Sequence, residues 1–99
     1  MTHISPHELK KLLEQSEVYL LDVREPDEHA AFNIGGSLVP LGEVISLHQT
    51  IPTDRTVIVY CKMGIRSQIA IQKLEEKFGY TNLVNLRGGI EAWKRMSDG

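Results

Sequence analysis

TVIVYCKMGIRS, residues 56–67, is the stretch of this sequence that decides the fold. Its first half, Thr56 to Tyr60, is rich in β-branched residues without polar alternation, which predicts a central strand buried on both faces. The chain's only cysteine, Cys61, follows directly, and a loop containing a glycine leads to a helix predicted over Ser67 to Phe78. Gly79 stands where a helix C-terminus favours a left-handed residue. The segment therefore predicts a strand, a short loop and a helix in succession.

Strand and helix signals alternate on both sides of this stretch. Ser5 and Glu8 form a capping box around Pro6, and Pro26 can open a second helix. Such alternation predicts an α/β fold: a small, mostly parallel sheet with helices on both faces and ligands beyond the carboxyl ends of the strands. The predicted helices cover residues 6–15, 26–31, 41–48 and 67–78 and resume at residue 90, and the predicted strands cover residues 18–21, 37–39, 56–60 and 83–86.

Composition excludes several classes of function. The 99 residues include 11 lysines and arginines against 13 aspartates and glutamates, with no charged block, so neither nucleic acid nor a membrane surface is an expected partner. The start, MTHISPHELKK, lacks the pattern of a signal peptide, which predicts a cytoplasmic protein or a domain excised from one. One cysteine excludes an internal disulfide, and no two of the four histidines share a helix face at metal-ligand spacing, so no metal or cofactor is expected.

The loop after Cys61 has the composition of an anion site. Gly64 permits a positive φ, so successive backbone N–H groups can turn inward around the sulfur at the mouth of the following helix. Lys62 and Arg66 add positive charge, and Ser67 can cap the helix or donate a hydrogen bond to whatever group the sulfur carries. A helix N-terminus and neighbouring cations favour the thiolate form of a cysteine. The loop is therefore predicted to stabilise negative charge on Cys61.

Simpler interpretations compete with this one. A lone cysteine after an apolar strand is most often a small packed side chain of the core. Arg66 could merely pair with a carboxylate such as Asp22. The four histidines are predicted to be solvated residues of surface helices or termini, which leaves Cys61 without a dedicated base.

Three segments together resemble the signature stretches of single-domain rhodaneses: LLDVREPDE (residues 20–28), CKMGIRS (61–67) and LRGGIEAW (86–93). The resemblance spans nearly the whole chain. It implies one rhodanese-like domain over residues 1–99 with a five-stranded, mostly parallel sheet, in which Ile4 begins a short first strand. It also implies a sulfurtransferase in which Cys61 carries a sulfane sulfur as a persulfide.

The same resemblance implies roles for particular residues and partners. Asp22 would support the loop from the neighbouring strand end, and the Arg87 turn would border the same face. The implied partners are a small anionic sulfur donor such as thiosulfate, a thiol or cyanide acceptor, and a sulfur-relay protein. The implied anion-binding loop is Lys62, Met63, Gly64, Ile65, Arg66 and Ser67, and the implied supporting residues are Asp22, Arg24 and Arg87.

One segment departs from the common family pattern. Residues 32–36, FNIGG, stand where many rhodaneses carry a glycine-histidine pair before the isoleucine. Together with the following LVPL, this segment is similar to rhodanese domains fused to ubiquitin-activating-like adenylyltransferases.

Two other classes of function remain as alternatives. A dual-specificity phosphatase of related fold has a Cys-x5-Arg loop, whereas Cys61 and Arg66 form Cys-x4-Arg. Since phosphate needs a wider ring of donors than one sulfur does, the shorter loop favours sulfur. The second alternative is a non-catalytic interaction module, which the intact loop disfavours.

Overall fold

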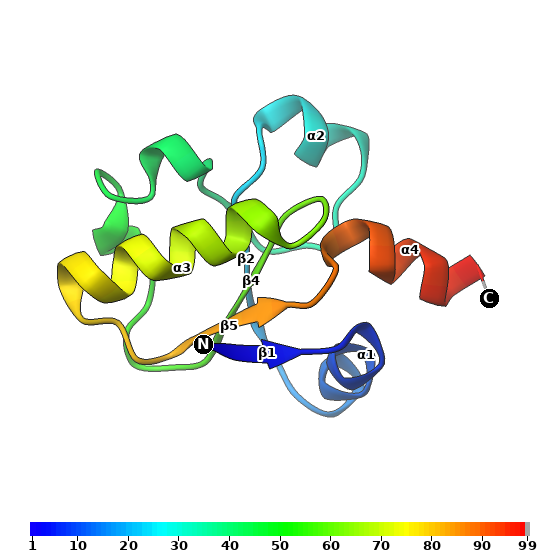
Figure 1. Cartoon of the computed structure of the whole chain (residues 1–99). Helices are drawn as coiled ribbons and strands as arrows, with labels where there is room; N and C mark the ends of the chain where they lie inside the picture. The colour runs from blue at the N-terminus through cyan, green and yellow to red at the C-terminus, as the bar shows by residue number, and fades with distance from the viewer. Residues whose placement is uncertain (99) are drawn as a thin grey trace.

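The structure is a computed structural model that describes residues 1–98, and its centre is a five-stranded sheet in the order β1-β5-β4-β2-β3 (Figure 1). Every neighbouring pair of strands is parallel, so the α/β prediction is confirmed and no strand runs against the others. The strands are β1 (Thr2–Ile4), β2 (Tyr19–Asp22), β3 (Ser37–Leu38), β4 (Val57–Tyr60) and β5 (Leu83–Leu86), and the α-helices are α1 (Pro6–Gln15), α2 (Pro26–Ala31), α3 (Ile65–Phe78) and α4 (Gly89–Asp98).

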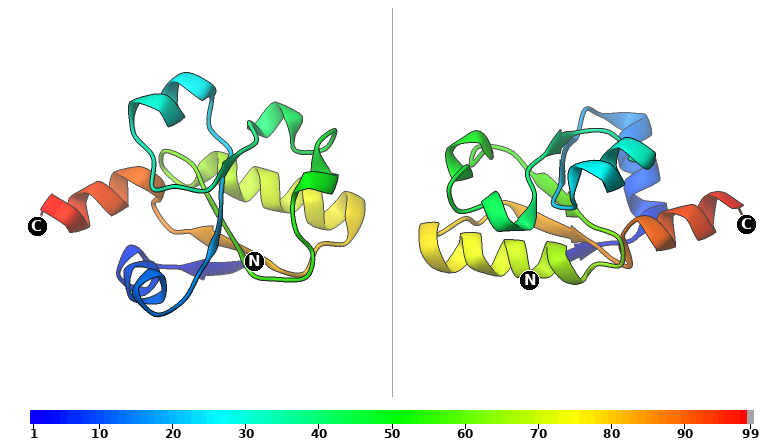
Figure 2. Two further views of the ribbon diagram at one scale, coloured as in Figure 1. Left: turned by 180° about the vertical axis from the view of Figure 1, so that it is seen from behind. Right: turned by 90° about the horizontal axis from the view of Figure 1, so that it is seen from above.

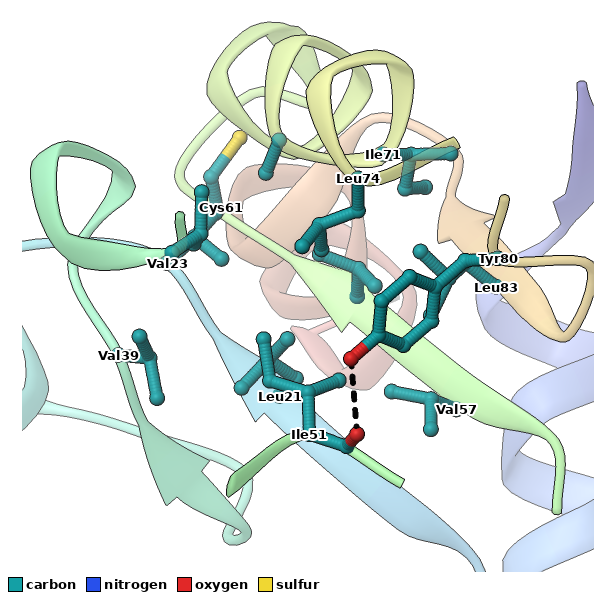
Figure 3. Close-up of a cluster of buried hydrophobic side chains, with 13 residues drawn as sticks. Leu21, Val23, Val39, Ile51, Val57, Cys61, Ile71, Leu74, Tyr80 and Leu83 are labelled. Carbon is teal, nitrogen blue, oxygen red and sulfur yellow. Dashed lines mark hydrogen bonds between the residues drawn. The ribbon is translucent and has the colours of Figure 1, made fainter. Parts of the chain in front are cut away.

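The helices cover both faces of the sheet, as predicted. Helix α3 lies on one face and α1 on the other (Figures 1 and 2), and each face has its own apolar cluster. The α3 face includes Leu21, Val59 and Leu74 (Figure 3). The α1 face includes Leu20, Ile58 and Leu9 and extends to α4 through Ile90. All four residues of β4 are buried, which confirms the predicted central strand.

Two glycines bound helix α3. Gly79 adopts φ 72° at the C-terminus, as predicted, and Gly64 adopts φ 93° at the N-terminus. The helix begins at Ile65, two residues before the predicted start at Ser67. The prediction that Ser67 caps this helix is therefore wrong, because Gly64 takes the N-cap position and Ser67 lies within the first turn.

The predicted helix over residues 41–48 is also wrong. This segment forms two 3₁₀ turns, Leu41–Glu43 and His48–Thr50, separated by non-helical chain. The pairs Leu41 and Val44, and Ile45 and His48, are each three residues apart, so they fit two successive 3₁₀ turns as well as one face of an α-helix. Val44 is fully buried against the α3 face of the sheet.

The first strand ends, rather than begins, at Ile4. It cannot continue because Ser5 caps α1 with Pro6 at its first position, which confirms the predicted capping box. Within residues 1–98, none of the helices is long and apolar enough to cross a membrane.

Candidate active-site loop

Cys61 occupies the first position after β4, at the carboxyl end of the central strand. Its backbone and Cβ pack at the edge of the apolar cluster on the α3 face, while its sulfur points away from that cluster (Figure 3). The sulfur accepts backbone hydrogen bonds from Gly64 at 3.1 Å and from Ser67 at 3.3 Å. The cysteine is thus a packed residue of the core whose sulfur also accepts two backbone hydrogen bonds from the loop.

The Gly88-Gly89 turn packs directly against this loop. Ile90 and Glu91 donate backbone hydrogen bonds to the carbonyls of Cys61 and Lys62 at 2.9 and 3.0 Å. A Cβ on Gly89 would lie 2.4 Å from the Cys61 carbonyl oxygen, which no relaxation of a flexible side chain could relieve. This close backbone approach requires glycine, and it fixes the position of Cys61 from the side of α4.

The guanidinium of Arg66 is held by Glu28 of α2. Two hydrogen bonds of 2.7 and 2.8 Å join the two groups in a bidentate pair. The pair lowers the pKa of Glu28 to about 2, chiefly through the hydrogen bonds from Arg66. Asp22 is not the partner of Arg66, because Arg24 and His29 already occupy that carboxylate.

Asp22 is fully buried and forms its own cluster at the end of β2. It accepts hydrogen bonds from the backbone and guanidinium of Arg24 and lies 2.8 Å from His29 Nδ1. Burial opposes ionisation of Asp22, but these bonds outweigh it and hold its pKa below the ordinary value. Arg24 also donates to the Phe32 carbonyl at 2.7 Å, beyond the end of α2.

The support that Asp22 gives to the loop is therefore indirect. Asp22 contacts Arg24, which precedes α2, and His29 within α2, and α2 in turn presents Glu28 to Arg66. The prediction that His29 is a solvated surface residue is wrong, since its ring is bound to a buried carboxylate.

A second polar cluster, which the sequence did not predict, lies behind the sulfur. Ser67 Oγ is 3.4 Å from Cys61 Sγ and donates to Asn85 Oδ1 at 2.5 Å. The Asn85 amide nitrogen lies 3.1 Å from His3 Nδ1, so His3 is not simply solvated either. Asn85 is the one polar residue in the otherwise apolar β5, at a position that shares a face with Leu83. A polar residue within an apolar strand was the feature of the sequence that could have indicated this cluster.

The open side of the loop forms a shallow pocket of about 250 Å³, lined by Cys61, Lys62, Met63, Ile65 and Arg66. Met63 and Ile65 are 60% and 65% exposed, so the rim is apolar. Lys62 is exposed and makes no ion pair with any side chain of residues 1–97. Arg87 is exposed as well, and its backbone N–H donates to Ile4 at 2.9 Å while the turn that follows it borders the loop.

Comparisons of the chain with known proteins point to one family. Residues 5–96 match the family model described as Rhodanese-like domain. A probable adenylyltransferase/sulfurtransferase, MoeZ, from Mycobacterium tuberculosis is 37% identical over 94% of this chain, which spans only 24% of that relative's length. A sulfurtransferase from Allochromatium vinosum is 39% identical over 87% of this chain and 80% of its own length. The human single-domain sulfurtransferase TSTD1 superposes with a TM-score of 0.81 at 30% identity, covering 96% of both chains.

Proposed function

Since the chain belongs to the rhodanese-like sulfurtransferase family, we propose that it transfers a sulfane sulfur through a persulfide on Cys61. The observation that carries the proposal is the pair of backbone N–H groups, from Gly64 and Ser67, that donate to the Cys61 sulfur. Such donors stabilise the thiolate, which is the nucleophilic form of cysteine. We take residues 1–99 as one domain with this single reactive centre.

In the first step, the Cys61 thiolate attacks the outer sulfur of thiosulfate. A new S–S bond forms to Cys61, the S–S bond of thiosulfate breaks, and sulfite leaves with the electron pair. Lys62 lies in the same pocket as the cysteine and has no carboxylate partner among the side chains of residues 1–97, so its charge is available to hold the anionic donor. Arg66, by contrast, is already neutralised by Glu28.

In the second step, an acceptor nucleophile attacks the terminal sulfur of the persulfide. The Cys61–sulfur bond breaks, the Cys61 thiolate is regenerated, and cyanide as acceptor would become thiocyanate. The chain has only one cysteine, so no internal disulfide can resolve the persulfide. The sulfur therefore stays on Cys61 until an external acceptor arrives.

The adenylyltransferase relative suggests that the cellular donor or acceptor is a protein of a sulfur-relay system. The apolar rim of Met63 and Ile65 around the pocket suits contact with another protein. A reducing compartment such as the cytoplasm is expected, because the reaction needs Cys61 as a free thiol.

Intact mass measurement tests the proposal. Incubation with thiosulfate, followed by removal of the excess, should add one sulfur atom to the protein, and cyanide or a reducing thiol should remove it. A phosphatase or a non-catalytic interaction module predicts no such adduct. An unchanged mass in folded protein with a free thiol, after both thiosulfate and a protein persulfide donor, would refute the proposed function.

A further inference from the structure

A line of buried polar groups runs from Cys61 to the edge strand of the sheet. It passes from the sulfur to Ser67 (3.4 Å), from Ser67 to Asn85 (2.5 Å) and from Asn85 to His3 (3.1 Å). Ser67 and Asn85 are 0% and 1% exposed, so the protein alone must satisfy their hydrogen bonds. Nothing in the two-step sulfur transfer uses this line beyond Ser67.

The direction in which each hydrogen along the line points depends on whether Cys61 is a neutral thiol or a charged thiolate. The Ser67 hydroxyl has one hydrogen and two possible acceptors, and the short contact to Asn85 Oδ1 places that hydrogen on the Asn85 side, the arrangement that we assign to a neutral Cys61 thiol. The thiol can then donate to Ser67 Oγ, and the Asn85 amide donates to His3 Nδ1. Every group has a partner, and every donor points from the sulfur toward His3.

A Cys61 thiolate favours the opposite direction of these hydrogen bonds. It has no hydrogen to donate, and its negative charge attracts the hydroxyl hydrogen of Ser67. If the Ser67 hydroxyl turned to the sulfur alone, the buried oxygen of Asn85 would lose its donor, which is costly. A half-turn of the Asn85 amide exchanges its nitrogen and oxygen with little movement of heavy atoms. The amide nitrogen then donates to Ser67 Oγ, and the oxygen accepts a hydrogen from His3 Nδ1.

We propose that Ser67, Asn85 and His3 form a hydrogen-bond relay whose direction reverses when Cys61 becomes a thiolate. Asn85 and His3 act as positioning residues that orient the Ser67 hydroxyl toward the charged sulfur. No proton travels along the relay: the thiol proton leaves to water, and His3 takes its Nδ1 hydrogen from water, either by a change of tautomer or by protonation. The inference rests on the proposed function in one respect, since the thiolate is the species that begins and ends each transfer.

The ionisable group nearest to His3 along the chain is the amino terminus of Met1, two residues before it. Strand β5 contains no ionisable residue, and α1 packs against the other face of β1 through Leu9 and Ile4. The charged groups nearest the sulfur are Lys62 and Arg66, and Arg66 is paired with Glu28. The remaining ionisable residues of α3, the helix that covers this face, are Lys73, Glu75, Glu76 and Lys77.

Nitrogen-15 NMR of the full chain, labelled at histidine, tests the relay by measuring the fraction of His3 that carries hydrogen on Nδ1. Spectra are recorded at a pH where ultraviolet absorbance shows that Cys61 is fully thiolate. The ratio of Nδ1-protonated to Nδ1-unprotonated His3 should be about tenfold higher in the natural protein than in Cys61→Ala, the size of one hydrogen bond to a charged group. His7, which is exposed, should give the same signal in both proteins and serves as the internal control.

Ser67→Ala should abolish the difference, because it cuts the relay while leaving the thiolate in place. Should that variant not fold, alkylation of Cys61 with iodoacetamide removes the charge without a substitution and should lower the His3 ratio in the same way. An identical His3 ratio in the natural protein and in its uncharged forms would overturn the relay, as would a response that survives Ser67→Ala. The NMR measurement needs no sulfur donor, so it is independent of the mass measurement. If His3 responds to the charge of Cys61 but no sulfur adduct forms, the proposed function is refuted and the relay is not.

Discussion

Replacing Gly89 by alanine should displace the loop that follows Cys61, because the added Cβ would collide with the backbone of that loop. The added Cβ would lie 2.4 Å from the carbonyl oxygen of Cys61 and 2.7 Å from the carbonyl carbon and oxygen of Lys62. These are backbone atoms, and the adjacent hydrogen bonds from Ile90 and Glu91 hold them in place. The contact can be relieved only if the loop or the start of α4 moves.

The cost has two parts. Gly89 has φ +59°, and a left-handed conformation costs an L-residue about 1–2 kcal/mol. Forcing an extra methyl group into a packed site adds about 1–3 kcal/mol. We expect Gly89→Ala to lower the free energy of unfolding by about 2–5 kcal/mol and to reduce sulfur transfer strongly in the protein that remains folded, because Cys61 is displaced from its donors.

Gly79→Ala is the matched control. Gly79 has a similar positive φ of +72°, but nothing lies within 4 Å of its added Cβ. It should show the conformational cost alone, about 1–2 kcal/mol, and leave sulfur transfer unchanged. Equilibrium urea unfolding measures both variants, with the slope of the transition confirming that they unfold from comparable states. If Gly89→Ala costs no more than Gly79→Ala and transfers sulfur normally, the turn does not fix the loop and the reasoning fails.

Three further substitutions test the loop. Cys61→Ser should eliminate the sulfur adduct, and an adduct that persisted by intact mass would place the sulfur elsewhere. Lys62→Ala should raise KM for thiosulfate about fivefold with little change in kcat, the effect of one exposed charge pair; unchanged thiosulfate dependence would remove lysine as the donor anchor. Glu28→Gln should cost about 1 kcal/mol at neutral pH, since the pair with Arg66 is partly exposed. Because the pKa of Glu28 falls from 4.5 to about 2 in the folded protein, this difference is complete above pH 4.5 and should vanish as the pH falls toward 2; a difference that persisted at pH 2 in urea unfolding would contradict the ion pair as its cause.

The sequence predicted those elements whose signals are local and strong. The apolar run of β4, the capping box of α1 and the left-handed Gly79 each depend on a few neighbouring residues, and each is confirmed. The N–H groups around Cys61 were also predictable, because Gly64 lies three residues after Cys61 and directly precedes the helix. In these places a few neighbouring residues determine the backbone conformation, whatever the rest of the chain does.

Pairings between distant residues could not be predicted in the same way. Arg66 had several carboxylates available, and only the placement of α2 beside the start of α3 selects Glu28, 38 residues away. Asn85 and His3 meet because β1 and β5 are neighbours in the sheet, although 82 residues separate them. Spacing within the sequence carries no record of such contacts, since they depend on the order of strands.

These distant pairings change the electrostatic interpretation of the site. The sequence placed Lys62 and Arg66 together as cations acting on the sulfur, yet Arg66 is committed to Glu28, and Arg24 is committed to Asp22. In the proposed thiolate, the charge on Cys61 is met mainly by the backbone N–H groups of Gly64 and Ser67, which have fixed positions and no net charge. Lys62 is left as the exposed cation that lines the pocket. This division suits a sulfur carrier, because neutral donors hold the anion on Cys61 without binding a multiply charged ion tightly, while the lysine can attract an anionic donor and release its product.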